Sequence, residues 1–163
     1  MPDQITTINP TTGKVLSTYE SMPWARIDAI LADAAHAQQA WARTDIAARS
    51  ETLLAVAAEL RRSLDELAML AVHEMGKPVA EAKAEVEKCA WVCEYYAQES
   101  PRALADEQVE ASGSRSWTSY EPLGTVLAIM PWNFPYWQVF RFAAPALAAG
   151  NAALLKHSPN VTA

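Results

Sequence analysis

The stretch TVLAIMPWNFPYWQVFRFAAPALAAGNAALLK, residues 125–156, decides the fold of this chain. It opens with the apolar run Thr125–Met130 and closes with the apolar run Ala152–Lys156, each of strand length. Such runs are typical of strands that are buried on both faces of a parallel sheet. Between them, the pattern predicts a helix over Pro135–Ala149 that Gly150 ends. The stretch therefore predicts a strand–helix–strand crossover, the connection that joins parallel strands.

Shorter β-prone runs lie outside this stretch. The segment Ile5–Glu20 carries the turn sequence NPTTGK at residues 9–14, which predicts a hairpin with a loop of several residues. An extended, loosely attached arm is the alternative for the same segment. Residues 101–113 are polar and acidic and indicate a connector. After the connector, Arg115–Glu121 is a strand candidate that Pro122 breaks.

Four helices are predicted between the hairpin and the connector, because apolar residues recur there at helical spacing. They run over Trp24–Arg43, Asp45–Arg62, Ser63–Met75 and Val79–Glu99. Ser63 with Glu66 matches a capping box at the start of the third helix, and Gly76 before Pro78 matches its end. The residues expected to face inward are Leu53, Leu54, Ala57, Leu60, Leu67, Leu70, Ala71, Met75, Ala82, Val86, Ala90, Cys93 and Ala97. We expect the four helices to pack together as a scaffold.

Composition excludes several classes of protein. The chain has 163 residues, of which 51% are hydrophobic and 20% charged, which suits one globular domain with a sizeable core. Its net charge is −6 and its Lys and Arg residues are scattered, so no nucleic-acid surface is expected. Its apolar runs are far shorter than the roughly 20 residues that span a bilayer. The first residues do not resemble a signal peptide, so we expect a cytoplasmic protein without a membrane partner.

Cysteine and histidine offer little chemistry. Cys89 and Cys93 stand one helical turn apart, a spacing open to a metal pair, a redox pair or two buried packing thiols, of which we favour the last. His36 and His73 fall in predicted helices and read as surface or packing residues. The sequence contains neither the glycine pattern of a dinucleotide-binding loop nor that of a P-loop.

The strongest chemical signal follows the first predicted strand, at Met130–Pro135. Ligands of open α/β sheets bind just beyond the carboxyl ends of parallel strands. Asn133 stands there between two prolines, and its side-chain amide is a neutral donor suited to a developing oxyanion. The alternative is that Asn133 caps the helix that begins beside Pro135.

Several segments together resemble the aldehyde dehydrogenase superfamily. IMPWNFP at residues 129–135 resembles the signature of that family, and the similarity continues through APALAAGN at residues 144–151. INPTTG at residues 8–13 and EMGKP at residues 74–78 also resemble family landmarks. KHSPNV at residues 156–161 is most similar to bacterial NAD(P)-dependent succinate-semialdehyde dehydrogenases. The resemblance implies an α/β, aldehyde dehydrogenase-like fold, here an N-terminal helical scaffold plus the first βαβ unit of an incomplete Rossmann-like parallel sheet.

The resemblance also implies a division of the chain. Residues 1–22 would form an N-terminal hairpin or arm, and residues 23–112 the helical part of the cofactor-binding domain. Residues 113–123 would start an oligomerisation arm, and residues 124–163 would form the first βαβ unit. A homo-oligomer is the expected assembly.

Family chemistry assigns roles to individual positions. Members oxidise an aldehyde to a carboxylate through a Cys nucleophile, with NAD or NADP as the hydride acceptor; succinate semialdehyde is the substrate that the subfamily implies. Asn133 matches the position whose amide contributes to the oxyanion hole. The positions matching cofactor contacts are Ile129, Met130, Pro131, Trp132 and Lys156. The positions matching the substrate tunnel are Phe134 and Arg141, with Arg141 expected to bind the distal carboxylate.

Two departures from the family pattern matter. Pro159 stands where members often carry Glu or Ser, which leaves the choice between NAD and NADP open. The Gly-Gln-x-Cys setting of the family nucleophile and the Glu-Leu-Gly-Gly setting of its general base do not occur in this sequence. The chain is therefore expected to be an inactive N-terminal part of such an enzyme. There are two alternatives. The chain could be a non-catalytic oligomerisation or binding module, or it could be a four-helix scaffold without a ligand.

Overall fold

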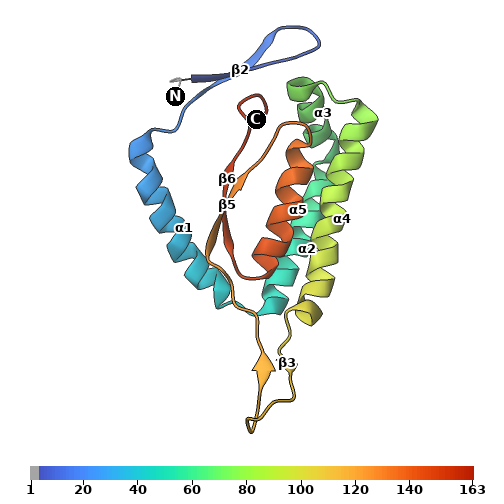
Figure 1. The fold of residues 1–163 in the computed structure, drawn as a ribbon. Coiled ribbons are helices and arrows are strands. Elements are labelled where there is room, and N and C mark those ends of the chain that lie inside the picture. Colours follow the sequence, from blue (N-terminus) through green and yellow to red (C-terminus); the bar gives the residue numbers. More distant parts are fainter. Residues whose placement is uncertain (1–3) are drawn as a thin grey trace.

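A computed structural model describes residues 4–163, with helices on both sides of a small parallel sheet (Figure 1). The helices are η1 Trp24–Arg26, α1 Ile27–Ala42, α2 Ile46–Arg62, α3 Leu64–Met75, α4 Val79–Ala103 and α5 Pro135–Ala148. The strands are β1 Gln4–Ile8, β2 Val15–Glu20, β3 Glu107–Gln108, β4 Trp117–Thr118, β5 Thr125–Ile129 and β6 Ala152–Lys156. β1 pairs with β2 and β3 with β4 in antiparallel fashion, whereas β5 pairs with β6 in parallel. The predicted hairpin and the predicted crossover are both confirmed.

Helix α4 is the centre of a bundle and contacts α2, α3 and α5. Small side chains dominate the interfaces, which lets the helices approach closely. The largest cluster of buried residues consists of Leu53, Ala57, Leu60, Val86, Cys89, Ala90, Val92, Cys93, Ala97, Ala144 and Ala148. Every residue predicted for the inner stripe of α4 is buried, which confirms that prediction. The inward position predicted for Leu54 is wrong, because its side chain is 44% exposed.

Helix α1 lies on the other side of the sheet from this bundle. It contacts β5 and β6, while α5 lies against β6 from the opposite side, as Figure 1 shows. The expectation that the four helices of Trp24–Glu99 pack as one scaffold is therefore wrong for the first of them. Helical periodicity identifies a face that needs cover but not the element that covers it. Here the parallel strands take that place, and α5 completes the bundle.

Side chains from α1 and α2 close the carboxyl-terminal end of α5. Carbonyl oxygens at this end have no partner within their own helix, and the helix dipole makes them partly negative. The three contacts are Trp41 Nε1 to Leu147 O at 2.8 Å, Arg49 Nε to Ala148 O at 2.9 Å and Gln38 Nε2 to Gly150 O at 3.1 Å. These bonds join the bundle, the crossover and α1 into one body.

The end of α3 confirms one predicted cap, and its start corrects another. Gly76 adopts φ 71°, the left-handed conformation expected of a glycine after a helix. A β-carbon at Gly76 would lie 3.1 Å from Pro10 Cγ, so the hairpin turn packs directly on this glycine. Ser63 precedes α3 but makes no capping hydrogen bond, since its hydroxyl donates to Glu59 in the previous helix. The predicted capping box is therefore wrong.

The region after α4 differs from the prediction in two ways. α4 continues past Glu99 to Ala103 and includes Pro101, which stands in the last turn of the helix, where few hydrogen bonds remain for it to disrupt. The predicted strand Arg115–Glu121 is reduced to the two residues of β4, which pair with β3 inside the predicted connector. The second correction depends on pairing with a segment that local pattern does not reveal. No helix among residues 4–163 is long and apolar enough to cross a bilayer.

Candidate active site

The turn that links β5 to α5 projects from the carboxyl edge of the parallel sheet. Ile129 pairs with Lys156 in register, and Met130 N donates to Lys156 O at 3.0 Å, so both strands end together. Beyond this point Trp132 is 49% exposed, and Asn133 is exposed as well. Figure 1 shows the start of α5 and the hairpin β1–β2 at the same end of the molecule.

Asn133 does not cap α5. The helix begins at Pro135, with Phe134 at the capping position and no capping bond from that side chain. The first free N–H groups, those of Tyr136 and Trp137, both donate at 2.9 Å to one carboxylate oxygen of Glu85 in α4. The capping alternative for Asn133 is therefore wrong, and within residues 4–163 its side chain forms no hydrogen bond.

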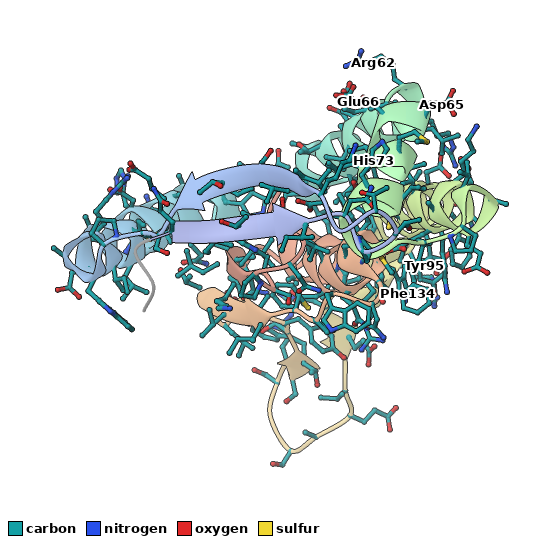
Figure 2. All side chains as sticks on the ribbon, turned by 90° about the horizontal axis from the view of Figure 1, so that it is seen from above. Arg62, Asp65, Glu66, His73, Tyr95 and Phe134 are labelled. Carbon is teal, nitrogen blue, oxygen red and sulfur yellow. The ribbon has the colours of Figure 1, made fainter. Side chains whose placement is uncertain are left out.

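Glu85 is one half of a buried ion pair. Its second carboxylate oxygen contacts Lys77 Nζ, and the side chains of Lys77 and Glu85 are only 4% and 2% exposed. Lys77 Nζ also lies 3.9 Å from the centroid of the Phe134 ring. Figure 2 looks down on this end of the molecule and places Phe134 beside the ribbons of α4 and α5. The pair thus lies directly behind the exposed turn.

Neither member of this pair was identified from the sequence. In the sequence, Lys77 stands in the helix stop Gly76-Lys77-Pro78 and in the family-like segment EMGKP, and neither feature predicts an ion pair. Glu85 stands between Ala82 and Cys89, on the face of α4 that is otherwise small and apolar. A charged residue inside a buried stripe needs a partner, and that conflict was the available signal.

Tyr136 lies between the ion pair and α3. Its hydroxyl donates to Leu67 O at 2.8 Å. Burial raises the pKa of Tyr136 well above its ordinary value, and the nearby charges of Glu74 and Glu85 add to the rise. Tyr136 therefore acts as a neutral packing and hydrogen-bonding residue that fixes the first turn of α5.

The residues predicted to contact a cofactor form one open surface. Ile129 is 70% exposed, Trp132 adjoins it, and Lys156 Nζ, whose only bond within residues 4–163 is to His157 O at 3.0 Å, is exposed at the next strand. Met130 is half-buried and Pro131 exposed. The structure therefore brings these five positions to one edge of the sheet, where most of the apolar side chains are exposed next to Lys156. Two hollows elsewhere are lined in part by Asp106, Gln108 and Trp117, and by Gln38, Arg43 and Pro122.

Phe134 stands at the capping position before α5, and Arg141 lies within the helix. They stand seven residues apart, which is about two helical turns or roughly 10 Å along the axis. Both side chains are exposed, and Arg141 makes no ion pair with any residue from 4 to 163. Helical side chains lean toward the amino terminus, which directs Arg141 back along the helix toward the turn.

The two cysteines belong to the core. Cys89 and Cys93 are buried free thiols, which confirms the packing role predicted for them. Burial raises the pKa of Cys89 to about 12 and that of Cys93 to about 11, and the charges of Glu85 and Glu94 respectively contribute. Among the described residues, no group of three or more His, Cys, Asp or Glu side chains is arranged to hold a metal ion.

Known proteins resemble the chain over nearly its whole length. The family described as "Aldehyde dehydrogenase family" matches residues 1–163. A probable succinate-semialdehyde dehydrogenase [NADP(+)] of Synechocystis sp. is 48% identical over 157 residues, 96% of this chain and 35% of that protein. The succinate semialdehyde dehydrogenase [NAD(P)+] Sad of Escherichia coli is 46% identical, over 94% of this chain and 33% of that protein.

Solved structures agree with the sequence relatives. The succinic semialdehyde dehydrogenase of Streptococcus pyogenes, solved with NADP+ as the cofactor, superposes with a TM-score of 0.91 at 34% identity. The match covers 96% of this chain and 35% of that one. The structure of Gox0499 gives a TM-score of 0.93 at 34% identity, covering 97% and 35%. The chain spans about a third of the length of the curated relatives that it matches. It belongs to the aldehyde dehydrogenase family.

Proposed function

We propose that this chain supplies the oxyanion-binding turn and part of the cofactor surface of an NAD(P)-dependent aldehyde dehydrogenase acting on succinate semialdehyde. One observation carries the proposal. Asn133 offers an exposed side-chain amide that forms no hydrogen bond with any residue from 4 to 163, on a proline-flanked turn at the carboxyl edge of β5. The names of the relatives supply the substrate class.

The turn stabilises charge on the substrate oxygen. When a nucleophile adds to an aldehyde, the carbonyl oxygen becomes negative, and the Asn133 amide donates a hydrogen bond to it. A donor held in place before the reaction costs no reorganisation when the charge develops. Phe134 lines the adjacent substrate path, and Arg141 binds the distal carboxylate through two parallel N–H bonds.

The exposed edge fits one side of a dinucleotide. Ile129, Met130, Pro131 and Trp132 offer an apolar surface to the nicotinamide half, and Lys156 offers a donor to a ribose hydroxyl. The nicotinamide ring, when bound, supplies the hydride acceptor. Names of relatives favour NADP, and Pro159 presents no carboxylate that would repel a 2′-phosphate.

Residues 1–163 alone should not turn over substrate. The family motifs that carry the nucleophile and the general base are absent from this sequence, and burial keeps the thiols of Cys89 and Cys93 protonated. We expect no NAD(P)H from succinate semialdehyde and only weak cofactor binding. Turnover that survives Cys89→Ala with Cys93→Ala, or a low-micromolar calorimetric dissociation constant, would contradict these expectations.

The function is tested in a chimaera in which residues 1–163 replace the matching segment of the Synechocystis relative. Asn133→Ala should lower kcat about a hundredfold to a thousandfold, with little change in KM. Arg141→Met should raise KM for succinate semialdehyde but not for butanal, which lacks the distal carboxylate. Full activity of the Asn133→Ala chimaera would contradict the proposed function. An equal effect of Arg141→Met on KM for both aldehydes would contradict the role of Arg141 in binding the distal carboxylate.

A further inference from the structure

Two side chains compete for one N–H group at the start of α5. An asparagine accepts from the main-chain N–H three residues later when it caps a helix. For Asn133 that group is Tyr136 N, because Pro135 has no N–H. In the structure Tyr136 N donates to Glu85 instead, at 2.9 Å. The residue that local sequence would use as a cap is displaced by a residue from another helix.

Charge and geometry explain why Glu85 prevails. Its carboxylate lies at the partly positive end of α5 and accepts from Tyr136 N and Trp137 N with a single oxygen. Hydrogen bonds to a carboxylate are stronger than those to a neutral amide. The Asn133 side chain would reach only one of the two N–H groups, so it gains little by capping.

Lys77 makes the buried carboxylate tolerable. An unpaired charge in the interior is costly, and Lys77 Nζ neutralises the oxygen of Glu85 that the helix does not use. Gly76 holds Lys77 in place by ending α3 under the hairpin turn. Lys77 also lies over the Phe134 ring, so the buried pair contacts the residues that directly follow Asn133.

We propose that Glu85 is a positioning residue that keeps the Asn133 side chain from turning onto the end of α5, because Glu85 occupies Tyr136 N, the donor from which the Asn133 carbonyl oxygen would otherwise accept. Lys77 is its neutralising partner. The use of the Asn133 side-chain N–H for an oxyanion rests on the proposed function, but the competition between Asn133 and Glu85 does not. Asn133 and Glu85 are therefore coupled through a group that both can bind.

The test is amide hydrogen exchange at Tyr136 in the 163-residue chain, measured by NMR relative to Ala144 in the same helix. In the wild-type background, Asn133→Ala should leave Tyr136 exchange unchanged. Glu85→Ala should speed it about tenfold to a hundredfold, and in that background Asn133→Ala should speed it again about threefold to tenfold. This non-additivity indicates competition. If the ion pair were purely structural, Asn133→Ala would have no effect on Tyr136 exchange in either background.

If Glu85→Ala does not fold, Asn133→Ala alone still tests the proposal, and two further variants check the role of the Glu85 oxygen and the specificity of the effect. Glu85→Gln retains an acceptor oxygen and should restore most of the protection of Tyr136. Lys83 lies in the same helix as Glu85 and forms an exposed ion pair with Asp65 of α3. Lys83→Met breaks that pair and is the matched control, which should leave Tyr136 exchange unchanged. Faster exchange from Asn133→Ala alone, or additive behaviour of the two changes, would overturn the proposal. Normal kcat for Asn133→Ala in the chimaera would instead overturn the proposed function and leave this coupling intact.

Discussion

The bundle side and the strand side of the molecule bury their apolar residues very differently. Along α4, Val86, Cys89 and Ala90 are 0% exposed, because small residues let three helices close around them. On the strands, Leu127 and Ile129 remain 62% and 70% exposed, although α1 and α5 lie on either side. Stability therefore resides in the bundle, whereas the strand side displays an apolar surface and the candidate site.

The largest expected contrast comes from placing one carboxylate on each side. Val86→Asp should destabilise the chain by about 4–5 kcal/mol, because the charge has no partner in the core. Leu127→Asp should change the free energy of unfolding by less than about 1 kcal/mol. Urea unfolding followed by circular dichroism measures both. Similar losses would mean that the strands are as deeply buried in solution as the bundle.

Thiol chemistry reports on the bundle alone. At pH 8, alkylation of Cys89 and Cys93 should be at least about a hundredfold slower in the native chain than in urea. Because burial raises both pKa values, the native state prefers the neutral thiols, and their contribution to stability is complete below the unfolded value of 9.0. That contribution should be lost as the pH rises from about 9 toward about 12. Equal labelling in native buffer and in urea at pH 8 would show that the bundle opens readily.

Association should depend on the strand side. Exposed Leu127, Ile129 and Leu155 should drive the chain into dimers or larger assemblies at micromolar concentration, detectable by sedimentation. Changing all three to Lys should weaken association by about tenfold or more. Leu54→Lys, at a comparably exposed leucine of α2, is the matched control and should leave association unchanged. A monodisperse wild-type monomer that binds no hydrophobic dye would contradict this expectation.

Smaller effects are expected from single polar contacts, such as those that join the two sides at the carboxyl-terminal end of α5. Arg49→Met should cost about 1.5–3 kcal/mol, because it removes a charged donor from Ala148 O. Trp41→Phe removes one neutral bond and should cost about 0.5–1.5 kcal/mol. Breaking the solvent-exposed pair of Arg62 and Glu59 should cause no measurable change in urea unfolding. If Arg49→Met leaves the free energy of unfolding unchanged, the hydrogen bond from Arg49 to Ala148 O does not stabilise the end of α5.

Local pattern was sufficient for most element boundaries. The apolar runs of β5 and β6, the left-handed Gly76 and the buried stripe of α4 all follow from neighbours within a few residues. The candidate turn around Asn133 was located by the same means, because it follows a strand and precedes a proline. The roles of the turn residues came from family resemblance.

Long-range pairing decided the rest. Whether α1 covers the bundle or the strands depends on which apolar faces meet, and helical periodicity does not predict the packing partner of a face. The cap of α5 is a carboxylate 51 residues earlier than Tyr136 in the chain, so a local capping rule assigns the wrong side chain. The sequence by itself determined where Asn133 stands. Only the tertiary structure decided that its side chain forms no hydrogen bond within residues 4–163, because the buried Glu85 of α4 occupies the first N–H groups of α5.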